Sequence, residues 1–228
     1  MKNFFCFLAL CLPMLVISSC SKDDDGGDNA PSGVRAVDLG LSVKWASCNI
    51  GATSPEQYGD YFAWGEIVIK NDYSWSNYKW CKGSYNTLTK YCTNSHSGYN
   101  QFKDNKTTLD LEDDAAYVNW GGNWRMPTYQ ELEELINNCT WTWTDDYNNT
   151  GVAGRIVTSM INNNSIFLPA AGFWYKTGNG QVCSEGVYLT SSLSDATSHA
   201  YYLDFYNDAV FTGLIYRSDG LSVRPVSE

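Results

Sequence analysis

The sequence predicts an α+β domain, and three observations support this fold class. Short runs of alternating apolar and polar residues, broken by clusters of asparagine and glycine, indicate many strands joined by irregular loops. Helical periodicity is confined to one or two segments near the middle of the chain. The half that follows these segments is rich in strand patterns, so the elements do not alternate as they would in an α/β protein.

The first nineteen residues are interpreted as a segment that is removed. Lys2 precedes an almost unbroken apolar run over residues 4–17, which is too short to span a bilayer and is typical of a signal peptide. Small residues come just before Cys20, as in a bacterial lipobox, where cleavage exposes a cysteine whose thiol is lipidated. We therefore expect a lipoprotein signal peptide at 1–19 and fatty acids such as palmitate on Cys20. An ordinary secretory signal with an incidental cysteine is the alternative.

Residues 20–33 are rich in aspartate, glycine and serine and have no apolar face, so they predict a solvated, flexible tether. The acidic run after Cys20 resembles the export tag that sends lipoproteins of Bacteroides-like bacteria to the outer face of the outer membrane. We expect a membrane partner through the lipid on Cys20 and a globular domain over residues 34–228. The net charge of −10 becomes −11 without Lys2, the one charge before Cys20, which argues against a nucleic-acid partner.

Two segments near the ends of the domain have nearly the same sequence. Residues 40–46 read GLSVKWA and residues 220–226 read GLSVRPV, and in each the apolar side chains alternate with polar ones. This period of two predicts half-buried strands with one apolar face. Pro225 has no N–H to donate and is expected at a strand end or sheet edge.

One helix is well marked by its capping residues. Thr128 is the expected N-cap, Glu131 completes a capping box, and Leu132, Leu135 and Ile136 form one apolar stripe. A shorter helix is predicted over residues 111–120, where acidic residues occupy the first turn.

Hairpins are predicted after this helix. Residues 155–170 read as two strands around an asparagine-rich turn, and residues 173–189 as two strands around a turn at 178–180. Residues 200–205 and 209–216 are two further predicted strands.

The chain has few residues suited to catalysis or metal binding. Only two histidines occur, and none of the motifs of serine hydrolases, phosphate-binding loops or zinc proteases is present. We therefore predict no catalytic residues, no cofactor and no metal site. The acidic residues Glu112, Asp113 and Asp114 suit either a calcium site or the start of a helix.

Five cysteines remain after the lipidation site, namely Cys48, Cys81, Cys92, Cys139 and Cys183. The number is odd, so at least one stays free. Cys81 and Cys92 are close enough in sequence to pair, and the alternative is that these thiols are buried as small apolar groups.

Four blocks of the sequence resemble a known family. Residues 37–66, 113–135, 164–173 and 220–226 are similar, in order, to the Fibrobacter succinogenes major paralogous domain, and WGGNWRMPT and IFLPAAG are the most specific parts. Members are mostly surface lipoproteins of Bacteroides-like bacteria, and the family is similar to the C-type-lectin-like fold. The resemblance implies that the first and last strands pair antiparallel. The calcium-binding triplets of sugar-binding lectins and the late cysteine pair of formylglycine-generating enzymes are missing.

The last stretch before the closing strand is the predicted binding region, because its residue types are those of adaptable binding loops. The candidate ligand-binding residues are Ser194, Asp195, Thr197, His199, Tyr206, Asn207, Asp208 and Tyr216. Ordinary polar turns and strand edges are the alternative. The predicted function is a non-catalytic binding or adhesion head for a glycan or protein ligand on the cell surface. A structural subunit of a surface complex is the second interpretation, and an enzyme acting on surface glycans is the third.

Overall fold

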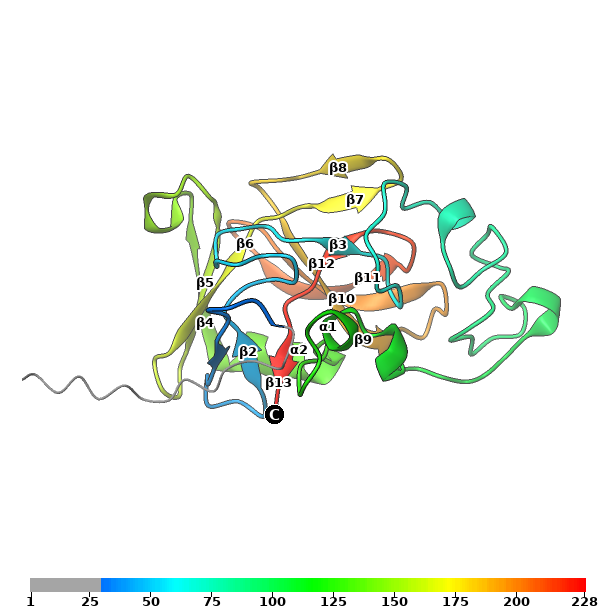
Figure 1. The fold of residues 1–228 in the computed structure, drawn as a ribbon, viewed down its shortest axis with the longest axis horizontal. Coiled ribbons are helices and arrows are strands. Elements are labelled where there is room, and N and C mark those ends of the chain that lie inside the picture. Colours follow the sequence, from blue (N-terminus) through cyan, green and yellow to red (C-terminus); the bar gives the residue numbers. More distant parts are fainter. Residues whose placement is uncertain (1–29) are drawn as a thin grey trace, which may run out of the picture.

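The computed structural model describes residues 30–228 and has the predicted α+β composition (Figure 1). The expected signal peptide and the lipidation site Cys20 lie outside the described residues. Val34 is buried and Ala30 packs against the core, so the globular part includes the last residues of the segment predicted as a tether. Within residues 30–228, no helix combines the length and the apolar character needed to cross a bilayer.

A five-stranded sheet with the order β11-β10-β9-β12-β3 forms the centre of the molecule. Its strands are β3 (Tyr61–Phe62), β9 (Gly186–Leu193), β10 (His199–Phe205), β11 (Val210–Tyr216) and β12 (Leu221–Ser222). In Figure 1 the α-helices α1 (Ala115–Trp120) and α2 (Tyr129–Asn138) lie below β3, β12 and β10 and beside β9, and α2 contacts β9, β10 and β11.

Three smaller sheets surround the central one. They consist of β1 (Ala36–Val37), β2 (Lys44–Ala46) and β13 (Val226–Ser227); of β4 (Cys139–Thr144), β5 (Gly154–Ser159) and β6 (Ser165–Pro169); and of the hairpin β7 (Phe173–Tyr175) and β8 (Gly178–Gly180). Short 3₁₀ turns occur at η1 (Trp75–Asn77), η2 (Tyr99–Gln101), η3 (Leu111–Asp113) and η4 (Tyr147–Asn149).

The two segments with similar sequences pair, as predicted. Strand β13 runs antiparallel to β2, with Val226 opposite Trp45. The Ala46 N–H donates to the Pro225 carbonyl at 2.9 Å, and the Ile50 N–H donates to the Val223 carbonyl at 3.1 Å. The C-terminal residues therefore lie beside the first strands of the domain (Figure 1).

The second of these segments is not half-buried, and this part of the prediction is wrong. Residues 221–227 are all buried, including Ser222 and Arg224. The reason is that β12 is paired on both edges, by β3 and β9, while Leu221 and Val223 pack in one apolar cluster and Val226 packs in the other. Arg224 remains satisfied because its guanidinium donates to Asn49 Oδ1 at 2.9 Å and to the carbonyls of Ala46 and Phe167.

Both predicted helices form, and their first residues follow from local capping. Thr128 and Glu131 make the expected capping box at α2, and Leu132 and Leu135 are buried. The region predicted as a helix over 111–120 begins as η3, and α1 starts only at Ala115. Asp114 accepts hydrogen bonds from the Ala116 and Tyr117 N–H groups and acts as the N-cap, which confirms the helix-start interpretation of this residue.

The strands predicted over residues 155–170 form the hairpin of β5 and β6. Those predicted over residues 200–205 and 209–216 form the antiparallel pair β10–β11. The turn predicted at 178–180 is wrong, because these residues form β8 and the chain reverses at Lys176 and Thr177. Strand β4, which follows α2 directly, was not predicted.

The core consists of two large apolar clusters and one smaller cluster formed mainly by the long segment after β3. Strand β9 contributes Val187 and Leu189 to one large cluster and Tyr188 to the other. All five cysteines are free, so the disulfide considered between Cys81 and Cys92 does not form. Four of the thiols are buried and Cys183 is exposed.

Candidate ligand-binding site

A long segment without regular sheet structure, residues 63–110, extends from one end of the molecule and lies at the right of Figure 1. Arg217, which directly follows β11, holds this segment against the central sheet. Its guanidinium is completely buried and donates to the Tyr78 hydroxyl at 3.0 Å and to three carbonyl oxygens, those of Lys90, Tyr91 and Thr197. It also lies over the ring of Trp64, 4.7 Å from the ring centroid.

An aromatic pocket of about 240 Å³ opens where this segment meets the end of β11 and the β7–β8 turn. This aromatic pocket is lined by Tyr73, Ser74, Trp75, Tyr85, Tyr175, Lys176, Tyr216 and Ser218. Three segments that are far apart in the sequence therefore contribute to one concave surface. A pocket with aromatic walls and a few polar groups is typical of ligand sites.

Backbone pairing fixes the position of the pocket walls. The Tyr73 N–H donates to the Lys176 carbonyl at 2.8 Å, which joins the long segment to the β7–β8 turn. Trp174 and Gly220 exchange two further backbone hydrogen bonds, at 2.7 and 2.9 Å. A Cβ atom on Gly220 would lie 2.5 Å from the Tyr73 ring, so the close approach of these segments requires glycine at position 220.

The rings of the pocket contact one another edge to face. The Trp75 ring centroid lies 6.0 Å from that of Tyr216 and 6.3 Å from that of Tyr85. Tyr85, Tyr175 and Tyr216 remain 53%, 52% and 44% exposed. Large aromatic side chains are usually covered, so three half-exposed tyrosines around one pocket provide both apolar faces and hydroxyl groups for a ligand.

Lys176 is the one cation that lines the aromatic pocket. Its Nζ lies 5.0 Å from the centroid of the Tyr175 ring, and among residues 30–228 no carboxylate lies within ion-pair distance of it. The backbone φ angle of Lys176 is +52°, a left-handed conformation that glycine and asparagine adopt at lower cost. The ammonium group is therefore available to a ligand in the pocket.

Two of the predicted ligand-binding residues lie at this site. Tyr216 lines the pocket, and the His199 ring packs on the Tyr216 ring with centroids 4.4 Å apart. The pairing of β10 with β11 places His199 directly opposite Tyr216. Burial lowers the pKa of His199, so the ring is neutral at physiological pH.

The other candidates do not form one face with these two, and two of them are not exposed. Ser194 and Thr197 are buried, and each hydroxyl is already used in a hydrogen bond to a carbonyl: Ser194 donates to that of Ala196 and Thr197 to that of Tyr91. Their predicted exposure is wrong.

Tyr206, Asn207 and Asp208 form the turn between β10 and β11, at the opposite end of the strands from His199 and Tyr216. The two groups are separated by seven residues of strand, or about 20 Å. Asp195 is exposed and lines a second hollow beside β11.

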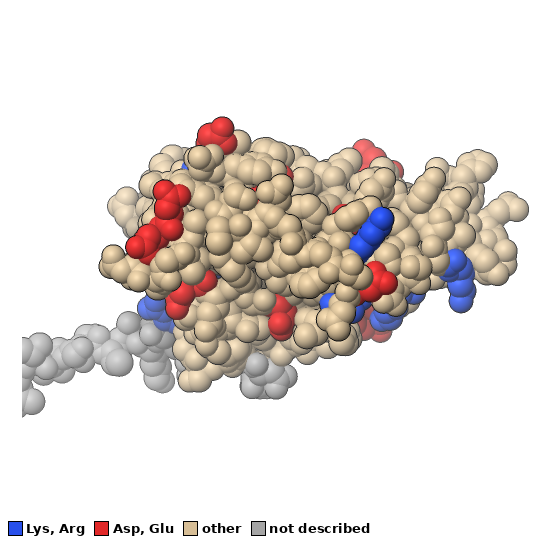
Figure 2. Space-filling view, turned by 90° about the horizontal axis from the view of Figure 1, so that it is seen from above, with Lys and Arg blue, Asp and Glu red and all other residues tan. Residues whose placement is uncertain are grey.

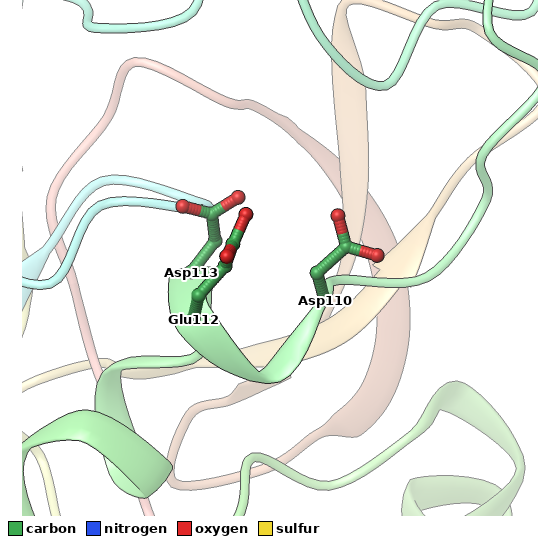
Figure 3. Close-up of side chains that lie close together, drawn as sticks. All are labelled: Asp110, Glu112 and Asp113. Atoms are coloured by element: carbon green, nitrogen blue, oxygen red, sulfur yellow. The ribbon is translucent and has the colours of Figure 1, made fainter.

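The acidic cluster at η3 already holds a cation from the protein itself. Oxygens of Asp110, Glu112 and Asp113 lie within 4.8 Å of one another and the three side chains converge (Figure 3). Lys90 Nζ lies 3.0 Å from Asp110, 3.1 Å from Glu112 and 2.5 Å from Asp113. Hydrogen bonds from Lys106 and Lys90 lower the pKa of Asp110. A calcium ion would have to displace the Lys90 ammonium, so these carboxylates form an ion-pair network that fixes the long segment.

A second pair of carboxyl groups, Glu185 and Asp204, is buried within the sheet. Tyr206 donates to Glu185 at 2.6 Å and Tyr202 donates to Asp204 at 3.2 Å. Burial, followed by the negative charge of Glu185, raises the pKa of Asp204 to about 7. Neither carboxyl lines the aromatic pocket.

On the face shown in Figure 2, charged side chains are scattered among a predominantly uncharged surface.

The pocket residues Trp75, Tyr85, Tyr175 and Lys176 were not predicted as site residues. The sequence shows that this region is rich in tryptophan and tyrosine, but it has no periodicity that would separate exposed rings from core rings. Trp64 and Tyr91, for example, come from the same segment and are fully buried.

No protein-family model, no curated protein and no solved structure matches the chain.

Proposed function

We propose that this protein is an outer-membrane lipoprotein, anchored through Cys20 and exposed on the cell surface, whose head binds a glycan without catalysis. The observation that carries the proposal is the convergence of Trp75, Tyr85, Tyr175 and Tyr216 around one pocket. The lipobox pattern before Cys20 and the acidic run after it support the location.

The fold and family in this proposal are those that the sequence blocks resemble, the Fibrobacter succinogenes major paralogous domain and the C-type-lectin-like fold. The antiparallel pairing of β2 with β13 supports this assignment, because the resemblance implies that the domain is closed by its two ends. Closure by the two ends also explains how a long irregular segment can be carried between them without unfolding the domain.

The chemistry of the pocket favours a sugar ring as the ligand. Sugars present C–H faces that pack on aromatic rings and hydroxyl groups that hydrogen-bond to tyrosine and serine, and both kinds of group line the pocket. Lys176 supplies one positive charge and no carboxylate lines the pocket. We therefore favour a glycan that carries a carboxylate or sulfate group.

The test is a glycan array probed with the full chain purified in mild detergent, with neutral and acidic glycans on the same array. The variant Tyr85→Ala removes one exposed ring of the pocket. The matched control Tyr117→Ala removes an exposed ring on α1, away from the pocket. We expect retention of acidic glycans by the wild type and the control, and a loss of about tenfold in affinity for Tyr85→Ala, since one stacked ring contributes about 1.4 kcal/mol.

Equal retention by both variants would exclude the pocket as the binding site. Retention of no glycan by the wild type would exclude the glycan proposal and would leave a protein ligand to be tested.

A further inference from the structure

Strand β11 forms a free edge of the five-stranded sheet. It is the last strand in the order β11-β10-β9-β12-β3, and its seven residues pair with β10 without interruption. The strand contains no charged residue and no proline, and Phe211, Leu214 and Tyr216 are exposed. Proteins often protect such an edge with lysine, proline or a bulge, and β11 has none of these.

The alternation of hydrogen bonds shows which backbone groups of β11 point outward. The Tyr206 N–H donates to the Ala209 carbonyl across the turn, so the pairs 204–211, 202–213 and 200–215 are the hydrogen-bonded ones. The N–H and C=O groups of Val210, Thr212 and Leu214 therefore face away from β10. Within residues 30–228 these groups have no hydrogen-bond partner.

A hollow of about 250 Å³ lies beside this edge and is lined by Tyr129, Asp195, Tyr201, Thr212, Gly213 and Leu214. The rings of Tyr129 and Tyr201 stack with centroids 4.2 Å apart. Leu214 lies opposite Tyr201, so a strand added beyond β11 would place the side chain next to Leu214 on this same face. The hollow is in the position to receive that side chain.

Three carboxylates lie around the edge, and the basic side chain of Arg155 at the turn before β11 is already used by the carbonyls of Tyr206, Ala209 and Trp141. Asp195 lines the hollow, Asp208 is exposed in the turn before β11, and Glu133 accepts a hydrogen bond from the Thr212 hydroxyl at 2.9 Å. Among residues 30–228 no lysine or arginine lies within ion-pair distance of Asp195. A second copy of this chain would bring the same three carboxylates to the interface and no basic residue from β11, so charge complementarity favours a different partner.

We infer that β11 is a docking edge for an extended segment of a partner protein, which adds to the sheet as a further strand. This segment is apolar or β-branched at alternate positions and places a lysine or arginine against Asp195 and the Tyr129–Tyr201 rings. Main-chain hydrogen bonds to Val210, Thr212 and Leu214 supply the affinity, and the basic side chain in the hollow supplies the specificity. This edge is separate from the aromatic pocket, so the two proposals are tested independently.

The experiment uses the full chain and two end-blocked nine-residue peptides of alternating threonine and valine, one with a central lysine and one with a central glutamate. Fluorescence anisotropy measures binding, and hydrogen exchange reports the amides of β11. We expect the lysine peptide to bind at least about tenfold more tightly than the glutamate peptide. We also expect it to protect the amides of residues 210, 212 and 214, whereas those of 211, 213 and 215 are protected in the free protein.

Two variants test the contribution of the strand edge and that of the Asp195 carboxylate separately. Leu214→Lys adds a charge to the exposed edge and should abolish binding of the lysine peptide, and Asp195→Asn should reduce the preference for lysine over glutamate to about threefold or less. The matched control Asp72→Asn, in the long segment, should leave both measurements unchanged.

Binding of both peptides with equal affinity, or protection of amides elsewhere than β11, would overturn the inference. Sedimentation showing that the chain forms a dimer that Leu214→Lys dissociates would assign the edge to a second copy instead, and would also overturn it.

Discussion

Trp45 lies directly opposite Val226, and this pair joins the first part of the domain to its last residues. Both side chains are buried in the same apolar cluster, which also contains residues of α2 and of β5, β6, β9 and β10. The pair therefore connects the end strands to the sheets that carry the rest of the chain.

We predict that Val226→Ala lowers the free energy of unfolding by about 1–3 kcal/mol, because it removes buried methyl groups and leaves a cavity in this apolar cluster. Urea denaturation measures the change. The control Val68→Ala alters an exposed valine and should change stability by less than about 0.5 kcal/mol. Equal effects of the two substitutions would show that pairing of the ends contributes no special stability.

Arg217→Met should release the long segment from the sheet. The substitution leaves the Tyr78 hydroxyl, the buried carbonyls of Tyr91 and Thr197 and the part-buried carbonyl of Lys90 without this donor, and each unsatisfied buried group costs about 1–3 kcal/mol. Limited proteolysis should show new cleavage within residues 78–91, and glycan binding should be lost because the pocket wall moves. Arg35→Met, at an exposed position, is the control. An unchanged cleavage pattern in Arg217→Met would contradict this role.

Gly220→Ala should disturb the aromatic pocket, since the added Cβ would overlap the fully buried ring of Tyr73. We expect a loss of about 1–3 kcal/mol in stability together with weaker glycan binding. Gly180→Ala is the matched control, because a Cβ at that position meets no atom within 4 Å. If both alanine variants bind alike, the close contact between Gly220 and Tyr73 does not determine the pocket.

The stability of the protein should fall as the pH rises through about 7. Burial, and then the charge of Glu185, raises the pKa of Asp204 to about 7 from an ordinary value of 3.8, and burial raises that of Asp219 to about 7 as well. The folded state thus binds protons more tightly than the unfolded state. The stability that these two groups contribute is fully present below the unfolded pKa and is lost as the pH rises through the folded one.

Melting temperatures between pH 5 and pH 8 test this dependence. Asp204→Asn should reduce the slope of the melting temperature against pH, because the amide does not titrate. A melting temperature that rises across this interval in the wild type would contradict the assignment of raised pKa values to these carboxyls.

Local patterns in the sequence predict several elements correctly. The capping box at Thr128 and Glu131 defines the start of α2 because all its partners lie within one turn of helix. The alternation in β5, β6, β10 and β11 predicts those strands for a similar reason. The similarity of residues 40–46 and 220–226 was sufficient, with the family resemblance, to predict that the ends pair.

Features that depend on distant partners were not predicted. Arg217 reads as a polar residue after a strand, yet it is fully buried because Tyr78, Tyr91 and Thr197 are brought around it. The sequence indicates a strand that continues through Lys176, but in the structure Lys176 lies in a turn. Its backbone pairs there with Tyr73, which is about a hundred residues earlier in the chain.

The sequence alone thus determined the composition of the domain, its helices and most of its strands, and it contains an apolar run shortly before Cys20. Only the tertiary structure decided which of the many aromatic residues form a pocket and which form the core, and that one edge of the central sheet is left open. The physical reason is that burial of a ring, and the pairing of a strand edge, depend on which distant segments pack against them and not on the residues beside them in the chain.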